Sequence, residues 1–329
     1  MVKPEDVLTI EEWYSPSITK AEMKQFLRRD NWHGLVNFAI WFALLAGVGY
    51  LGYLLINTLW AIPVFFLYGV IYAGSNGRHH ECMHGTVFKT RWLNDFFYFF
   101  CGVMEIRDII DFRWSHTRHH SYTIWRGVDP EILVMRPPKL SHFLLDFFYL
   151  RSGPRALFNM VLHSFGIVSA HSKNYVEPED YKRMFWWSRA NLVIWLGFIG
   201  LAVYFHSWLP LLYFGLPRFY GGFFLWCFVL LQHVGLSENV WDHRKNTSSV
   251  HVNPFLSFLF MHMENHVEHH LFPLVPYHQL PKLHQKLKEQ VPVPYKSLWH
   301  GMSHVVPMVI RQRRDPNAFI DRSIPFEAD

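Results

Sequence analysis

An uncharged apolar run near the N-terminus limits what this chain can fold into. Residues 35–56 read LVNFAIWFALLAGVGYLGYLLI, which is 22 residues with one Asn and no charged side chain. At about 1.5 Å per residue, a helix of that length crosses the roughly 30 Å hydrocarbon layer of a bilayer. A second apolar run, 58–74, follows after Asn57 alone. The two runs predict a pair of membrane-spanning helices joined by a tight turn.

A second apolar region, 191–232, predicts another pair of spans. The region breaks near 206–210, which gives spans near 191–205 and 209–231. Arg218 interrupts the last of these, and we expect it to face a polar interior or an interface rather than acyl chains. The predicted fold is therefore all-α, an integral membrane protein with four transmembrane helices in two hairpins.

The positively charged residues lie on one side of this predicted topology. Of 31 Lys and Arg, 30 fall in 1–34, 75–190 and 233–329, and none falls in the two hairpin turns. The positive-inside rule therefore places both termini and the long middle segment in the cytosol. We predict one domain, 1–329, in which 1–34 is a cytosolic N-terminal segment. Residues 75–190 and 233–329 form a cytosolic helical cap with a helix near 280–289. In a prokaryote the membrane would be the cytoplasmic one.

The composition is that of a protein partly in lipid and partly in water. Apolar residues make up 50% of the chain and charged residues 17%, against about 25% charged in an ordinary soluble domain. This balance excludes a disordered or fibrous chain. The net charge of +5 is the positive-inside excess, so we expect no nucleic-acid partner. The three cysteines are far apart, and we expect a reducing compartment without disulfides.

Histidine is frequent for such a chain, with 22 residues, and three clusters of it fall in the predicted cap. They read HECMH at 80–84, HTRHH at 116–120 and HVEHH at 266–270. Side chains at i, i+3 and i+4 share one face of a helix, so each cluster can aim two or three imidazoles at one point. Imidazole binds Zn, Cu, Fe and Ni, and eight such residues exceed the four ligands of a structural zinc. The pattern predicts two metal ions with open coordination positions.

The three clusters, in this order and beside four apolar spans, resemble the histidine boxes of the membrane fatty-acid desaturase and hydroxylase superfamily. The resemblance is carried by HECMHGT at 80–86, HTRHHSYT at 116–123 and NHVEHHLFPLVPYHQLPKLH at 265–284, within a similarity over roughly 30–290. It implies a non-haem centre of two iron ions, with O2 as co-substrate. It also implies that two electrons come from an external carrier.

The resemblance further implies which residues bind the metals. The box histidines implied as ligands are His80, His84, His116, His119, His120, His266, His269 and His270. Members of the superfamily often use one more histidine just after the last span, and His233 stands there. Metal-bound histidines usually donate their second N–H to a carboxylate or carbonyl. Carboxylates near the boxes that are available for this are Glu81, Asp129, Glu131, Asp242, Glu264 and Glu268. The supporting residues that we single out are Asp129, Glu264, Asn265, Asn239 and His262.

Such a site suits oxidation of an unactivated C–H bond, which protein acids and bases cannot achieve alone. The two HxxHH boxes look most like the desaturase branch, so we expect desaturation of a fatty acyl chain or a related lipid-like substrate. A hydroxylase or ketolase acting on a lipid, carotenoid or small metabolite stays open, because carotenoid ketolases share an HxxMHG-like first box. We expect no catalytic side chain beyond the metal ligands.

The electrons need a partner, because the sequence shows no cytochrome-b5-like haem segment and no Cys-rich ferredoxin segment. A carrier of the ferredoxin, rubredoxin or cytochrome b5 type, with its reductase, is expected. The basic face that includes Lys282, Lys286 and Lys288 is a candidate for docking it. A histidine-rich membrane metal transporter is the distant alternative. Transporters place ligands within spans, often in inverted repeats, whereas every box here lies outside the predicted spans.

Overall fold

The computed structural model describes residues 13–325, and in that part of the chain the regular structure is helical. Besides helices, the described residues contain one isolated parallel bridge, between Val250 and Tyr295, and no longer strand. The all-α class predicted from the sequence is confirmed. Residues 1–12 of the predicted N-terminal segment and 326–329 of the predicted cap lie outside the described residues.

The chain divides into two compact units. Unit 1 consists of Met1–Arg29, Ser115–Phe143 and Cys227–Asp329, and unit 2 consists of Asp30–Trp114 and Leu144–Trp226. Three helices contain a unit boundary, namely α6 (Ile109–Ser121), α7 (Leu140–Leu145) and α12 (Phe223–His233). The second and third histidine boxes therefore belong to unit 1, and the first belongs to unit 2.

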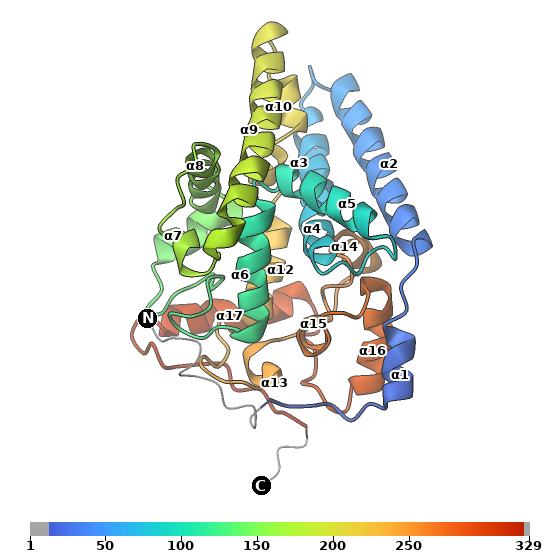
Figure 1. Cartoon of the computed structure of the whole chain (residues 1–329), viewed down its shortest axis with the longest axis vertical. Coiled ribbons are helices and arrows are strands. Elements are labelled where there is room, and N and C mark those ends of the chain that lie inside the picture. Colours follow the sequence, from blue (N-terminus) through green and yellow to red (C-terminus); the bar gives the residue numbers. More distant parts are fainter. Residues whose placement is uncertain (1–12, 326–329) are drawn as a thin grey trace. The chain divides into compact units, whose positions relative to one another are not determined.

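Unit 2 contains two helices that are long and apolar enough to cross a bilayer. One is α2 (Trp32–Leu54), and the other is α9 (Tyr181–Tyr204) with the turn that precedes it. Only 28% and 17% of their most apolar windows are buried inside the protein. A core helix of a soluble protein would bury most of its apolar surface, so these exposed apolar faces fit contact with lipid. In Figure 1, α2 lies beside the shorter α3 (Ala61–Tyr72), against which it packs.

The predicted fourth span is not a single helix. Residues 209–231 are divided among α10 (Leu209–Tyr213), α11 (Pro217–Tyr220) and most of α12. The first break contains Gly215, whose φ of +89° suits glycine alone. At the second break, a Cβ on Gly221 would lie 2.0 Å from the backbone of Gly69 in α3. The residues are apolar, as the composition indicates. The close approach of two backbones nevertheless interrupts the helix that was predicted over 209–231.

The other elements complete each unit. In unit 2, α4 (Ser75–Met83) carries the first box and packs on α5 (Arg91–Met104), and α8 (Ser152–Ser164) packs on α9. The helices wholly in unit 1 are α1 (Lys20–Phe26), α13 (His243–Asn246), α14 (Pro254–Leu259), α15 (His266–Leu271), α16 (Leu280–Leu287) and α17 (Leu298–Arg311). Short 3-10 helices lie at Asp146–Phe148, Ser172–Asn174, Pro178–Asp180 and Tyr277–Gln279. The helix predicted near 280–289 corresponds to α16, and α15 packs against both α13 and α16 (Figure 1).

Arg218, the charge inside the fourth predicted span, pairs with a buried carboxylate of unit 2. Its Nε donates to Glu105 Oε2 at 2.9 Å, and its guanidinium lies 4.2 Å from the ring centroid of Tyr149. Glu105 is fully buried and also accepts from Ser75 Oγ at 2.6 Å and Asn76 Nδ2 at 3.1 Å. The expectation that Arg218 faces a polar interior is confirmed. Since Ser75 and Asn76 begin α4, the ion pair also anchors the helix that carries the first box.

Breaking this pair is expected to destabilise the protein strongly. Arg218→Met leaves Glu105 buried without its cation, which costs about 3–5 kcal/mol. The double variant Arg218→Met with Glu105→Gln removes both charges and should recover much of the loss. Thermal unfolding of the detergent-solubilised protein measures this, with Arg155→Met on the exposed face of α8 as the control. An Arg218→Met transition as high as that of the control would contradict the role of the pair.

Candidate metal centre

Four predicted ligands of unit 1 converge from three helices. His119 of α6, His233 of α12 and His270 of α15 are buried and bring one ring nitrogen each within 4.8 Å of one another. The Nε2 atoms of His119 and His233 are 3.2 Å apart, and Nε2 of His266 in α15 lies 3.0 Å from that of His233. Two imidazoles that bind one ion at about 2.1 Å each hold their nitrogens roughly 3 Å apart. The spacing is therefore that of shared ligation.

The opposite ring nitrogens of two of these histidines show where the protons are. His119 Nδ1 lies 2.9 Å from a carboxylate oxygen of Asp129, and His233 Nδ1 lies 3.0 Å from the backbone oxygen of Asn246. A carboxylate and a carbonyl only accept, so both Nδ1 atoms carry a hydrogen. In its neutral form each ring then presents a lone pair at Nε2. Two lone pairs that face each other at 3.2 Å call for a cation between them.

A hydroxyl group likewise places the ring hydrogen of His270 on Nδ1. Its Nδ1 lies 3.2 Å from Thr123 Oγ1, and that hydroxyl donates its hydrogen to the backbone oxygen of His119 at 2.7 Å. Thr123 therefore accepts from His270, which leaves a lone pair on His270 Nε2. This Nε2 is buried and has no hydrogen-bond partner among residues 13–325. A buried polar atom without a partner is costly, and a metal ion would satisfy it.

Burial keeps two of these rings neutral, which is the form that binds metals. Desolvation lowers the pKa of His233 to about 3 and lowers that of His270 well below its usual value. Desolvation also acts on His119, but the Asp129 carboxylate outweighs it and raises the pKa of His119. Burial opposes ionisation of Asp129 as well, yet His119 and two backbone N–H groups lower the pKa of that carboxyl. Asp129 is thus an anion that increases the basicity of His119.

A second group of histidines in unit 1 lies on two of these helices, α6 and α15. His116, His120 and His269 have ring nitrogens within 4.8 Å of one another. The Nε2–Nε2 distances are 3.1 Å from His120 to His116 and 3.2 Å from His120 to His269. His116 Nδ1 lies 2.8 Å from Glu131, whose other oxygen accepts from Ser115 Oγ at 2.6 Å. A carboxylate again fixes the tautomer of a candidate ligand.

The two HxxHH boxes contribute their histidines to the two groups in opposite ways. In each box the outer two histidines, four residues apart, belong to one group, and the middle histidine belongs to the other. The groups lie side by side, because the rings of His120 and His270 stack with centroids 4.2 Å apart. Cluster A comprises His119, His233, His266 and His270, and cluster B comprises His116, His120 and His269. The arrangement offers two adjacent metal positions built from α6, α12 and α15.

A buried carboxylate inside the third box anchors α15. Glu268 is fully buried and accepts from His284 Nδ1 in α16 at 2.5 Å. Its second oxygen accepts from Ser249 Oγ at 3.1 Å. These bonds hold α15 in one rotation about its axis, which keeps its histidines aimed at the two clusters.

The first box, in unit 2, presents one buried imidazole, His80, and one partly buried imidazole, His84. His80 and His84 have ring centroids 5.0 Å apart and can bring one nitrogen each within 4.8 Å of the other. Burial lowers the pKa of His84 to about 3. Glu81, between them, is fully buried and accepts from Thr86 Oγ1 at 3.0 Å. The i, i+4 spacing thus yields a pair of imidazoles suited to one metal ion.

Of the five supporting residues singled out from the sequence, Asp129 contacts a candidate ligand. The side chains of the other four have different partners among the described residues. His262 Nδ1 bonds Ser257 Oγ at 2.8 Å and Glu264 Oε1 at 3.2 Å, and Asn265 Nδ2 donates to the His262 carbonyl at 3.2 Å. Asn239 accepts from a backbone N–H at 2.8 Å. These four residues are close to the boxes in the sequence, but the side-chain partners given above are other residues.

Sequence reasoning missed three residues at the clusters. Thr123 follows His119 by four residues, and that helical spacing is a signal that could have found it. Asn246 carried no signal, because its backbone oxygen accepts from His233. His243, which lies outside the three boxes, is buried, and its ring centroid lies 5.1 Å from that of His270.

The described residues combine helical structure, long exposed apolar helices and adjacent histidine clusters. These features are typical of one class of proteins, the helical membrane metalloproteins. Comparison with known proteins identifies the family within that class. The family model described as "Fatty acid desaturase" matches residues 59–301, which include all three boxes. The chain belongs to the fatty acid desaturase family, and it is an oxidoreductase of that family.

Three curated relatives show the range of this similarity. A Delta(9) fatty acid conjugase-like enzyme of Dimorphotheca sinuata is 25% identical over 263 residues, which cover 68% of this chain and 69% of the relative. A zeaxanthin 4-ketolase of Chlamydomonas reinhardtii is 25% identical over 261 residues, with 77% and 51% covered. Beta-carotene 4-ketolase 3 of Haematococcus lacustris is 24% identical over 238 residues, with 68% and 62% covered. Identity alone does not separate the acyl-chain relative from the carotenoid relatives.

Proposed function

We propose that this protein is a membrane di-iron enzyme that uses O2 to desaturate a fatty acyl chain or a related lipid-like substrate. The observation that supports it most is the reciprocal use of the two HxxHH boxes, which builds adjacent clusters A and B. The ligand set we propose is the eight box histidines together with His233. These donors are all imidazoles, which suit iron, and a structural zinc would need only four ligands.

The proposed reaction balances with an external supply of electrons. Substrate, O2, two electrons and two protons give an alkene and two water molecules. Bound iron would supply the activation of O2, which protein side chains cannot. The residues of this chain position and insulate the metals. Asp129 and Glu131 hold His119 and His116 in the tautomer that carries its hydrogen on Nδ1, and burial of both clusters limits the access of water.

We also propose four membrane spans in two hairpins, with the termini and the boxes in the cytosol. The one-sided distribution of Lys and Arg supports this orientation. Exposed tryptophans near the two predicted hairpin turns support a membrane–water boundary there. Trp60 is 71% exposed and Trp208 is 73% exposed. Tryptophan is enriched at the membrane–water interface. The interrupted helices over 209–231 would cross the bilayer as a broken span packed against α3.

The test combines metal analysis with product analysis. We expect purified protein to contain two iron ions per chain. Expression with a matched ferredoxin and its reductase should yield a lipid lighter by two hydrogen atoms, detected by untargeted mass spectrometry. An active preparation that contains zinc alone would contradict the di-iron proposal. Active electron transfer without any altered lipid would contradict the substrate class.

Hydroxylation or ketone formation is the second candidate, because two of the three relatives described above are carotenoid 4-ketolases by name. Hydroxylation consumes the same O2, two electrons and two protons but yields an alcohol and one water molecule. The same mass spectra distinguish the two outcomes. A product heavier by one oxygen atom, from a carotenoid supplied in the assay, would favour this candidate over desaturation.

A further inference from the structure

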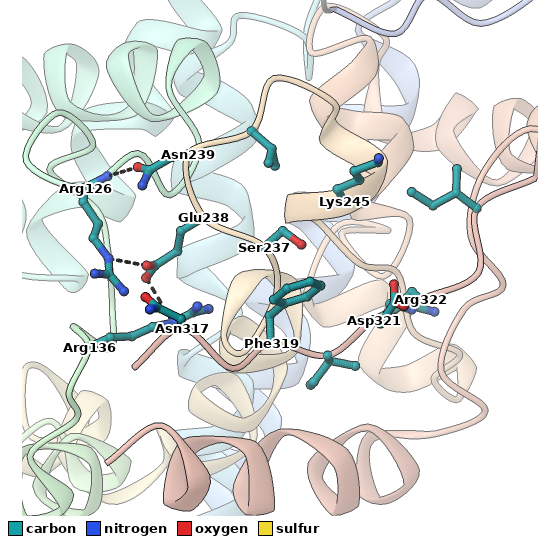
Figure 2. A pocket seen from close by; sticks show the side chains of 13 residues that line it. Arg126, Arg136, Ser237, Glu238, Asn239, Lys245, Asn317, Phe319, Asp321 and Arg322 are labelled. Atoms are coloured by element: carbon teal, nitrogen blue, oxygen red, sulfur yellow. Dashed lines mark hydrogen bonds and ion pairs between the residues drawn. The ribbon is translucent and has the colours of Figure 1, made fainter. Parts of the chain in front are cut away.

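Unit 1 contains a charged pocket that the proposed reaction has not used. The pocket has a volume of about 450 Å³ and is lined by segments near 126–136, 237–245 and 317–324. Figure 2 shows its charged side chains. The cationic lining residues are Arg126, Arg136, Lys245 and Arg322, and the acidic ones are Glu238 and Asp321. Four positive and two negative side chains leave an excess of positive charge, which attracts an anionic partner.

The positive charge is held in place by the protein. Glu238 bonds two guanidinium groups, Arg136 Nε at 3.1 Å and Arg126 Nε (Figure 2). Arg126 and Arg136 also donate to the backbone oxygens of Pro316 and Ala318, at 3.2 and 3.4 Å, which ties down the C-terminal segment. The Arg322 guanidinium lies 4.4 Å from the ring centroid of Tyr295, a neutral partner. The pocket is therefore a built cationic surface.

This pocket lies next to cluster A. Its lining residue Val240 accepts from Asn246 Nδ2 at 3.0 Å, and its lining residue Lys245 is bonded covalently to Asn246. The backbone oxygen of Asn246 in turn accepts from His233 Nδ1 at 3.0 Å. The path from the pocket wall to a proposed ligand is thus one peptide unit and one hydrogen bond. Because electron transfer slows steeply with distance, an electron delivered here has a short route to the metals.

One lysine of the basic face suggested by the sequence has a partner within unit 1. Lys286 of α16 pairs with Glu22 of α1 at 2.7 Å. Glu22 is itself fixed by a capping box with Thr19. The charge of Lys286 is therefore already used to hold α1 against α16.

We propose that the pocket is the docking site of an acidic one-electron carrier protein, and that the Asn246–His233 hydrogen bond is the entry point of the electron. The inference rests on the proposed function, which needs two electrons per turnover. A reduced carrier docks, loses one electron and leaves oxidised, and a second carrier repeats the step. Acidic side chains of the carrier would face Lys245 and Arg322 at the pocket. Charges of this kind raise the association rate and make it depend on salt concentration.

The first test measures binding on the metal-free full-length protein in detergent. The probes are a plant-type ferredoxin, a rubredoxin and a cytochrome b5, each at low and high salt. We expect at least one to bind, and Lys245→Glu to raise its Kd by about 10-fold or more at low salt. Lys288→Glu makes the same charge change at the exposed residue that caps the C-terminus of α16 and should change the Kd by less than about 2-fold. Lys245→Gln, with a smaller effect in the same direction, covers the case in which Lys245→Glu does not fold.

The second test maps the contact. A carbodiimide joins a carrier carboxylate to a nearby lysine amine, and peptide mass spectrometry should find Lys245 joined before Lys282 or Lys288. Equal weakening by Lys245→Glu and Lys288→Glu, or joining mainly at Lys282 or Lys288, would overturn the proposal. So would protection of Lys245 by pyrophosphate when none of the three carriers binds, because the pocket would then be a small-anion site. Binding needs neither iron nor turnover, so a chain that docks the carrier but holds no iron refutes the proposed function alone.

Discussion

His119→Ala is expected to lose the metal ion of cluster A and to lower turnover by more than about 100-fold, which exceeds the usual effect of a residue that only supports a ligand. His119 is the one cluster A ligand on α6, and its lone pair faces that of His233 at 3.2 Å. Cluster B shares no ligand with cluster A, so its ion should remain. Iron content per chain should fall from two ions to one. Elemental analysis of protein that still inserts into the membrane measures this.

The corresponding variant of cluster B tests the same assignment. His269→Ala removes the one cluster B ligand on α15, so it should also leave one iron ion per chain, and the double variant should leave none. His304→Ala, at an exposed position on α17, is the control and should keep both ions. Full activity in either single variant, or loss of both ions from His119→Ala alone, would show that the clusters are not assigned correctly.

Asp129→Asn is expected to weaken iron binding at cluster A by about 10–100-fold, the usual effect of removing a carboxylate that holds a metal-bound histidine. The amide keeps the size of the side chain but removes the charge that raises the pKa of His119 and fixes its proton on Nδ1. An amide N–H facing Nδ1 would favour the tautomer that protonates Nε2, the metal-binding atom. Titration with a competing chelator measures the affinity of each ion.

Glu131→Gln is the matched variant, because Glu131 holds His116 of cluster B in the same way. It should weaken the second ion and leave the first unchanged. If Asp129→Asn and Glu131→Gln weaken both ions equally, or lower only thermal stability, then these carboxylates support the fold and do not tune individual metals. Activity of Asp129→Asn should recover at high iron concentration, because the remaining ligands are intact.

Much of the fold and site follows from local sequence patterns. An apolar run of sufficient length forms a helix wherever it lies, so α2 was predicted closely from 35–56. Histidines three and four residues apart share a helix face in any context, so each box could be predicted as a metal-binding face. The fourth span shows the limit of this reasoning, because the contact of Gly221 with Gly69 involves residues far apart in the chain.

The sequence by itself determined the residue types, their spacing on each helix and the sidedness of the charge, because these depend on neighbours within one or two turns. Tertiary structure decided which histidines meet, because that depends on how α6, α12 and α15 pack. Spacing placed all three histidines of an HxxHH box on one broad face, and packing divided them between clusters A and B. The bond from His233 to Asn246 was also decided by packing, since every residue carries the same backbone oxygen. The partition between two metal positions is therefore a property of the folded chain.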